Sequence, residues 1–266
     1  MNIGFIGAGN MASAIIGGIV KSGLEYDSII VSDLSKEKLQ DISEKFNVST
    51  TTENCTAAEN ADILFICVKP NVVEAVSKDI KESISCDTVV VSIAAGVTLN
   101  ALERYFGNDK KIVRIMPNTP ALVGEAMSAL CYNNIAENDY KQVVDIMNSL
   151  GSCCVVSESL FDVVTAVSGS SPAYVFMFIE AMADGAVQGG MNRDLAYKFA
   201  AQSVLGSAKM VLETGKHPGE LKDMVCSPGG TTIEAVAVLE QTGFRNSVIE
   251  AMNACRDKSI QMQKKS

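Results

Sequence analysis

Two periodicities alternate along the first 158 residues. Short apolar runs rich in Val and Ile, typical of buried strands, are separated by segments with apolar residues at helical spacing. The first predicted strand opens NIGFIGAG, and further strands lie in SIIVSDL, ADILFICVKP, TVVVSIAAG, KIVRIMPNTP, AMSALCY and SCCVVS. Helices are predicted after the first glycines and near residues 36–46, 71–84, 98–106 and 137–150. This alternation predicts a largely parallel sheet covered by helices on both faces.

The pattern changes near residue 160, where the strand-like runs stop. Helices are predicted to begin near Pro172, Arg193, Pro218, Thr232 and Phe244, with glycines between several of them. The predicted fold class is therefore α/β, an N-terminal doubly wound sheet followed by an all-α C-terminal domain. We place the sheet domain at 1–158 and the helical domain at 159–266.

The segment SPAYVFMFIEAMADGAVQGG is apolar on nearly every side for its first two turns. A helix that is hydrophobic all round needs cover on all sides. One helical domain of this size cannot supply that cover, so a second copy of the chain is predicted to do so.

Composition narrows the classes of partner. The 266 residues are 47% hydrophobic and carry a formal net charge of −9. Basic residues are scattered, which argues against nucleic acid and anionic membranes and favours a small-molecule partner. Neither a leader nor an apolar run long enough to span a bilayer is evident, so a cytoplasmic protein is expected. The single His and eight dispersed Cys predict reduced thiols and no metal site.

The first turn contains Gly7-x-Gly9-x-x-Ala12 between a predicted strand and a predicted helix. Gly7 permits the tight turn, Gly9 lets backbone amides approach a pyrophosphate, and Ala12 lets the helix lie on the strand. Asp33 ends the second predicted strand, where an acidic residue meets an adenosine ribose. The pattern favours a dinucleotide site of the Rossmann type over a structural glycine turn.

The choice of dinucleotide is left open by the residues around Asp33. Asp33 favours NADH because its carboxylate accepts from the ribose hydroxyls, whereas Ser32, Ser35 and Lys36 leave room for the 2′-phosphate of NADPH.

Three further strand ends carry unusual residues, in Cys67-Val68-Lys69-Pro70, Ala94-Ala95-Gly96 and the MPNTP segment of 116–120. In an open parallel sheet, ligands bind beyond the carboxyl ends of the strands. Ala94 and Ala95 leave space for a nicotinamide ring, and Lys69 reaches a ribose or phosphate. The alternative is a set of packing turns with a solvated lysine.

In VCSPGGTTIEAVAVLE, Thr231 is followed three residues later by Glu234, which predicts a capping box with Thr231 as N-cap and a helix over 232–242. Pro228, Gly229 and Gly230 then lie just outside the helix. Open amides and the helix dipole make this position suitable for a carboxylate. A plain capped turn is the alternative.

Taken in order, these segments resemble pyrroline-5-carboxylate reductase from residue 5 to about residue 252. The matching stretches are FIGAGNMA, VKP, SIAAGV, RIMPNTP, DVVTAVSGSSPAYVF, EAMADGAVQGGM, GSAKMVLETGKHPGELKDMVCSPGGTTIEAV and LEQTGFRNSVIEAM. SGSSPAY combined with SPGGTTIEA is specific to that family. Two positions depart from its commoner patterns, since Asp33-Leu34 stands where many members have a polar pair that includes Arg, and Ser171 replaces a Gly.

The resemblance implies hydride transfer from NADPH or NADH to the C=N bond of 1-pyrroline-5-carboxylate, giving L-proline in the last step of its biosynthesis. It places Thr165 beside the substrate nitrogen, as the expected catalytic residue. In one alternative, the Thr165 hydroxyl and a water relay a proton to the substrate nitrogen. In the other, the substrate arrives protonated and the protein only orients it. We favour orientation, with Thr165 assisting. The expected substrate-binding residues are Ser227, Gly229, Gly230, Thr231 and Thr232. The expected cofactor-binding residues are Ile6, Gly7, Ala8, Gly9, Asn10, Met11, Ser32, Asp33, Asn54, Cys67, Val68, Lys69, Pro70, Ile93, Ala94 and Ala95.

The family also implies a homodimer through the helical domains, with larger rings of dimers in some members, and an active site that draws Thr165 and the SPGGTT loop from different subunits. Two rival functions remain. A β-hydroxyacid dehydrogenase needs a Lys after a Gly-rich turn, which SGSSPAYVF lacks. A non-catalytic nucleotide-binding regulator would tolerate an eroded substrate loop, yet SPGGTT is complete.

The remaining polar candidates are assigned no chemistry. His217 is interpreted as a loop residue that opens a helix, and Asp162, Glu180 and Asp184 as structural hydrogen-bonding groups.

Overall fold

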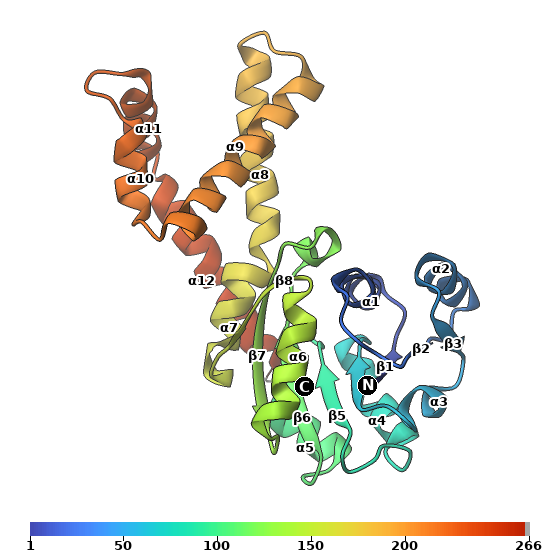
Figure 1. Cartoon of the computed structure of the whole chain (residues 1–266). Helices are drawn as coiled ribbons and strands as arrows, with labels where there is room; N and C mark the ends of the chain where they lie inside the picture. Colours follow the sequence, from blue (N-terminus) through green and yellow to red (C-terminus); the bar gives the residue numbers. More distant parts are fainter. Residues whose placement is uncertain (264–266) are drawn as a thin grey trace. The chain divides into compact units, whose positions relative to one another are not determined.

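The computed structural model describes residues 1–263, which form two compact units (Figure 1). The sheet unit consists of Met1–Ser170 and the described residues from Cys255 onward; the helical unit is Ser171–Ala254. The compact units thus divide later than residue 158, the boundary expected from the end of the strand pattern. The last helix returns to the sheet unit because Asp162 Oδ1 accepts hydrogen bonds from Ser259 Oγ at 2.6 Å and Gln263 Nε2 at 2.7 Å.

The sheet has eight strands in the order β3-β2-β1-β4-β5-β6-β7-β8. Every neighbouring pair is parallel except β6 and β7, so the predicted parallel-dominated sheet is confirmed. β3 and the helix after it were not predicted, because STTTENCTAA contains no apolar run. The strands are β1 (Asn2–Ile6), β2 (Ser28–Ser32), β3 (Ser49–Thr51), β4 (Ile63–Ile66), β5 (Val89–Ser92), β6 (Lys111–Met116), β7 (Ala126–Asn133) and β8 (Gly151–Val155).

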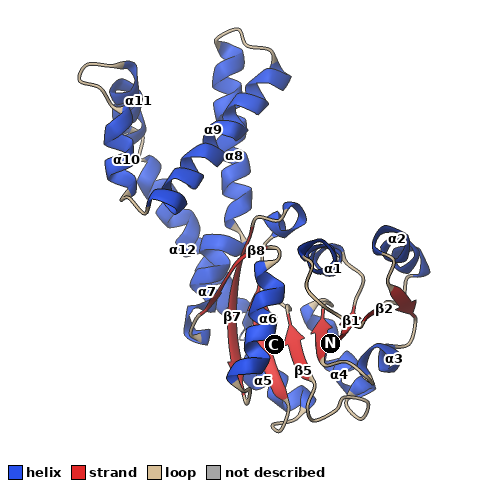
Figure 2. Cartoon of the chain, in the orientation of Figure 1, coloured by secondary structure: helices blue, strands red, loops and turns tan. Residues whose placement is uncertain are grey.

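Helices cover both faces of the sheet, as Figure 2 shows. One core contains residues of α1, α2 and α6 with Phe5 and Phe65, whose rings stack 4.9 Å apart. The other core contains residues of α3, α4 and α5 with Leu64 and Ile66. Because side chains alternate along each strand, β4 contributes to both cores. The helices are α1 (Asn10–Ser22), α2 (Lys36–Phe46), α3 (Asn54–Ala58), α4 (Val73–Ile80), α5 (Leu99–Phe106), α6 (Glu137–Asn148) and α7 (Phe161–Val164), with shorter turns η1 (Pro70–Val72), η2 (Thr119–Val123), η3 (Glu158–Leu160) and the π-helical η4 (Thr165–Gly169).

The helical unit contains α-helices throughout, as predicted: α8 (Ser171–Gln188), α9 (Arg193–Thr214), α10 (Pro218–Val225), α11 (Thr231–Gln241) and the first half of α12 (Phe244–Gln263). Among its described residues, the buried apolar side chains are Ala183, Ala196 and Ala200. Phe176 is 63% exposed and Phe199 is 62% exposed. A unit with so small a core and so much exposed apolar surface requires a further covering surface.

One stretch differs from the expectation that no apolar run can span a membrane. The helical stretch Glu158–Gln188 is long and apolar enough to do so by length and composition, with a mean hydropathy of 1.2 over 18 residues. The sequence shows no unbroken apolar run of that length, because Ser168, Ser170 and Ser171 separate the apolar residues on either side.

Candidate active site

The glycine-rich turn follows β1, which lies between β2 and β4 in the sheet. The strand order reverses direction there, because β2 and β3 lie on one side of β1 and β4 lies on the other. Gly7 has φ +102°, and a Cβ there would lie 2.6 Å from the Cys67 carbonyl oxygen, so only glycine fits. Its N–H donates to Ser32 O at 2.8 Å, and Cys67 N–H donates to Ile6 O at 2.7 Å. The turn is thereby fixed at the topological switch point of the sheet, where open α/β sheets bind ligands.

The start of α1 is open to a ligand. Gly9 is the N-cap, in an extended conformation, and makes no side-chain capping bond. A Cβ on Gly9 would meet no atom within 4 Å, whereas Ala12 is fully buried against the sheet. Asn10 is exposed and Met11 is half-buried in this first turn. Free amides at a helix start, with space in front of them, fit the pyrophosphate of a dinucleotide.

Asp33 is already engaged with the backbone. Its Oδ2 accepts from Ala8 N at 2.8 Å and its Oδ1 accepts from Ser35 N at 2.8 Å. The half-buried carboxylate therefore ties the end of β2 to the glycine-rich turn and is held beside it. Each oxygen keeps a further lone pair, so the group retains the capacity to accept from a ribose hydroxyl.

Ser32 and Asn54 form a second link at this edge. The buried Ser32 hydroxyl donates to Asn54 Oδ1 at 2.8 Å, and Asn54 Nδ2 donates to Asp79 Oδ2 at 2.9 Å. Asp79, on α4, was not predicted from the sequence, because nothing local links it to a residue 25 positions earlier. The chain of bonds fixes the side chain of Asn54 at the edge.

The remaining strand ends adjoin this turn because the strands are in register. Ile6 pairs with both Ser32 and Ile66, and Ile66 pairs with Ser92. The residues just after these positions therefore share one edge. Of the predicted cofactor-binding residues there, Ala94 is buried, Val68 and Ile93 are half-buried, and Lys69, Pro70 and Ala95 are exposed. Burial raises the pKa of the Cys67 thiol, so at neutral pH it brings no negative charge to this edge.

Thr165 begins the π-helical turn η4 in the sheet unit. Its hydroxyl donates to Phe161 O at 2.8 Å, so the hydrogen is committed to that carbonyl. The buried Phe161 ring lies 4.4 Å from the guanidinium carbon of Arg114, and Arg114 pairs with Glu158 at 2.7 Å. Segments that bulge into π geometry occur frequently at functional sites.

The predicted substrate loop lies at the start of α11 in the helical unit, and one part of its prediction is wrong. The N-cap is Gly230, not Thr231, and the helix runs Thr231–Gln241 rather than 232–242. The reason is a turn in which Gly230 N–H donates to Ser227 O at 3.0 Å, with Gly229 at φ +65°. A Cβ on Gly230 would lie 2.2 Å from Ser227 Oγ, so a side chain there would require the Ser227 hydroxyl to rotate away.

Without a side-chain cap, the first amides of α11 have no side-chain acceptor. Ser227, Gly229 and Thr231 are exposed and Thr232 is half-buried. Thr165 belongs to the sheet unit, and this loop belongs to the helical unit.

Three of the other polar candidates have structural partners, whereas the side chain of Glu180 is exposed and makes no hydrogen bond within residues 1–263, so its interpretation as a structural group is wrong. His217 is the N-cap of α10, and its Nδ1 accepts from Gly219 N at 3.0 Å, as its interpretation as a helix-opening residue predicts. Asp162 holds the end of α12, and Asp184 pairs with Arg193. All eight cysteines are free thiols, and no cluster of three potential metal ligands occurs within residues 1–263.

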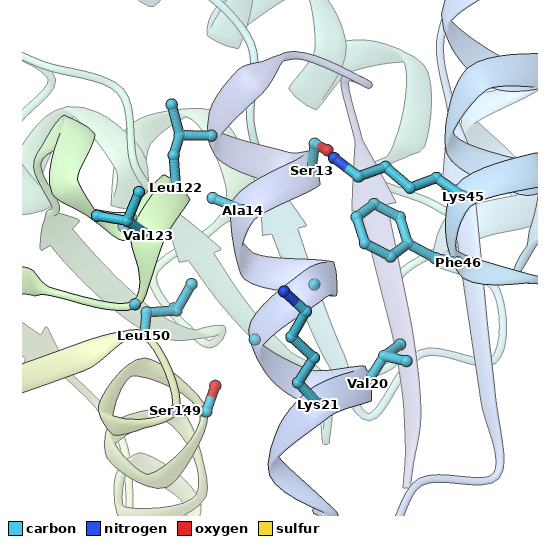
Figure 3. A pocket seen from close by; sticks show the side chains of 14 residues that line it. Ser13, Ala14, Val20, Lys21, Lys45, Phe46, Leu122, Val123, Ser149 and Leu150 are labelled. Carbon is cyan, nitrogen blue, oxygen red and sulfur yellow. The ribbon is translucent and has the colours of Figure 1, made fainter.

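A cavity of about 400 Å³ lies elsewhere on the sheet unit, between α1, the end of α2 and η2 (Figure 3). Leu122 and Val123 form one wall, and the side chain of Lys45 extends from α2 toward α1. Its lining shares no residue with the predicted cofactor-binding set, so the glycine-rich edge remains the candidate site.

Comparison with known proteins connects both units to one family. Residues 158–262 match the family described as pyrroline-5-carboxylate reductase dimerisation, and residues 2–96 match NADP oxidoreductase coenzyme F420-dependent. The pyrroline-5-carboxylate reductase of Escherichia coli is 53% identical over 264 residues, 98% of each chain. The structure of such a reductase from Coxiella burnetii shares 37% identity with a TM-score of 0.92, over 98% of both chains. A Plasmodium falciparum pyrroline carboxylate reductase with NADP bound shares 34% identity and a TM-score of 0.88, over 99% of this chain and 98% of that one. The chain therefore belongs to the pyrroline-5-carboxylate reductase family.

Proposed function

We propose that this protein reduces the C=N bond of 1-pyrroline-5-carboxylate to L-proline, the last step of proline biosynthesis. It is an NAD(P)H-dependent oxidoreductase. The observation that carries the proposal is a pair of open helix starts within one chain of this family. One is the Gly9-capped start of α1 at the strand edge, and the other is the Gly230-capped start of α11.

The dinucleotide supplies the hydride from its nicotinamide, and the chain supplies binding and orientation. The backbone amides of Gly9, Asn10 and Met11 hold the pyrophosphate, while Gly7 and Ala8 shape the turn through their own backbone bonds. Ser32, Asp33 and Asn54 face the adenosine ribose, and the segments of 67–70 and 93–95 line the nicotinamide side. This assignment is supported by the shared edge of the strand ends and by the open space in front of Gly9.

The substrate carboxylate binds at the start of α11. The amides of Gly229, Thr231 and Thr232 donate to it, and the hydroxyls of Ser227 and Thr232 add hydrogen bonds. Gly230 closes the turn beside them through its own N–H. The uncapped helix start supports this assignment, as does Gly229, where a Cβ would meet no atom within 4 Å and an anion can therefore approach.

Thr165 orients the substrate nitrogen. Its hydroxyl hydrogen is donated to Phe161 O, which leaves oxygen lone pairs to accept an N–H. A protonated imine presents such an N–H and accepts hydride more readily than the neutral imine. We therefore assign Thr165 to holding a substrate that arrives protonated, with a proton relay through the hydroxyl and a water as the alternative.

A second copy completes the molecule. The protein is a homo-oligomer, and we propose a homodimer through the helical units, assembled in turn into rings of dimers. Thr165 of one subunit then works with the α11 loop of the other.

The apolar stretch Glu158–Gln188 lies within the match to the dimerisation family, so we assign its surface to the partner subunit rather than to lipid. We also propose a cytoplasmic location, and no nucleic-acid binding, which the net charge of −9 supports.

Oxidation of NADH and of NADPH, followed at the nicotinamide absorbance with 1-pyrroline-5-carboxylate, tests this function. Wild-type protein turns over, and Thr232→Ala raises KM for the imine by about tenfold because a charge-assisted hydrogen bond is lost. Thr242→Ala is the matched control, since Thr242 lies beyond the far end of α11 and donates to Val238 O. Absence of turnover with either dinucleotide, from folded and dimeric protein, refutes the proposal.

A further inference from the structure

One backbone hydrogen bond is missing where the π-helical turn that carries Thr165 meets α8. Within the turn, Ser170 N–H donates to Thr165 O at 2.8 Å, five residues back. Four residues after Ser168 stands Pro172, which has no N–H to donate. The carbonyl of Ser168 therefore lacks the donor that α-helical bonding would have given it.

Asn118 supplies that donor from the end of β6. Its Nδ2 donates to Ser168 O at 3.0 Å, and its Oδ1 accepts from Met127 N at 3.0 Å. The residue is 9% exposed, so both bonds are largely shielded from water. One buried amide thus joins the turn, the end of β6 and the start of β7, a rigid part of the sheet.

Close packing reinforces the same contact. A Cβ on Gly169 would lie 2.7 Å from Met116 Cε, at the last residue of β6. Within the turn, Ser168 Oγ donates to Val164 O at 3.0 Å, as Thr165 Oγ1 donates to Phe161 O. The direction in which the Thr165 oxygen points therefore depends on how the turn is held against β6.

We propose that Asn118 is a positioning residue of the reductase reaction, which fixes the η4 turn so that Thr165 meets the substrate nitrogen. The proposal rests on the function proposed above and on the assignment of Thr165 to the substrate nitrogen. Asn118 does not touch the reacting atoms; it acts through the Ser168 carbonyl on the position of Thr165.

Asn118→Asp is the sharpest variant because it keeps the shape and exchanges the donor for an acceptor. One carboxylate oxygen still accepts from Met127 N. The other carboxylate oxygen faces the partial negative charge of the Ser168 carbonyl oxygen and is repelled by it. We expect kcat to fall by roughly 10- to 100-fold, the range that a displacement of about 1 Å produces. The Kd for the dinucleotide, measured by fluorescence, stays within about twofold, because the glycine-rich edge does not depend on this bond.

Asn134→Asp is the matched control. Asn134 Nδ2 also donates to a backbone carbonyl, that of Asn108, at 2.8 Å. Asn134 lies just after β7, and the last residue of β7 pairs with Ile112 near the start of β6, whereas Asn118 lies just after the end of β6. Its kcat is expected to remain that of the wild type. If Asn118→Asp does not fold, judged by circular dichroism, Asn118→Ser replaces it, because a serine hydroxyl is too short to serve both partners.

A double-mutant cycle with Thr165→Val separates positioning from a general structural role. If Asn118 acts through Thr165, Asn118→Asp causes no further loss of kcat in the Thr165→Val background. A loss that persists in full in that background overturns the proposal, as does wild-type kcat for folded Asn118→Asp. Wild-type kcat for Thr165→Val also overturns it, while leaving the reductase function intact, because the wild-type turnover is measured in the same assay.

Discussion

At the scale of single residues, Asp33 combines a structural and a discriminating role. Both of its oxygens accept backbone N–H groups, from Ala8 and Ser35, so the carboxylate is held beside the turn. A fixed negative charge repels a 2′-phosphate, whereas a ribose hydroxyl can donate to it. The exposed Lys36, three residues further along the chain, carries a positive charge that offsets part of this repulsion.

Asp33→Asn therefore raises the ratio of kcat/KM for NADPH to that for NADH by about tenfold, because the like-charge repulsion is removed. Steady-state kinetics with each dinucleotide measure the ratio. Asp41→Asn removes the same charge from the exposed surface of α2 and leaves the ratio unchanged. An unchanged ratio in Asp33→Asn would show that the carboxylate does not face the ribose.

At the scale of elements, an ion pair between the buried Arg114 and the half-buried Glu158 attaches the segment that leads to η4. Arg114 is 5% exposed within β6, and its guanidinium contacts both Glu158 and the ring of Phe161. Glu158 Oε1 also accepts from Leu99 N at 2.7 Å, at the start of α5. These contacts join β6, the start of α5 and the segment just before α7.

Arg114→Met is expected to lower the free energy of unfolding by about 2–3 kcal/mol, because Glu158 and the space around it lose a buried partner. Denaturant unfolding at one fixed protein concentration measures this change. Lys78→Met breaks the exposed pair with Glu74 and costs less than about 0.5 kcal/mol. If the two substitutions lowered the free energy of unfolding equally, the Arg114–Glu158 pair would have no special structural role.

At the scale of the whole molecule, the helical unit requires a partner surface. Its core contains three alanines, while Phe176 and Phe199 are more than half exposed. Apolar area of this kind is stabilised only when another surface removes it from water. The match of residues 158–262 to a dimerisation family identifies that surface as a second copy.

Phe176→Glu places a charge on this surface and is expected to convert the oligomer to a species near the chain mass of 28.2 kDa. Sedimentation velocity measures the change. Leu34→Glu, at a side chain 89% exposed in the sheet unit, leaves the oligomer intact. If Phe176→Glu sediments as the wild type does, α8 lies outside the interface.

The sequence predicted most of the elements but not all of their ends and contacts. The strand ends that form the candidate site were recognisable because glycines and small residues interrupt apolar runs. β3 and α3 were not predicted from the sequence, because these elements are short and their residues are mostly polar. Thr231 was assigned as N-cap from a local pattern, whereas the turn closed by Ser227 and Gly230 moved the cap by one residue.

What the sequence by itself determined is the part of the molecule that depends on near neighbours along the chain. Periodicity fixed the alternating elements and the change to helices near residue 160, and the glycine motifs located both open helix starts. Contacts across the chain were decided by the tertiary structure. Asn118 meets Ser168 fifty residues away, Asp162 meets Ser259 and Gln263, and Arg114 meets Glu158. No local pattern encodes such pairs, because each partner is selected by which strand and helix ends pack together in the fold.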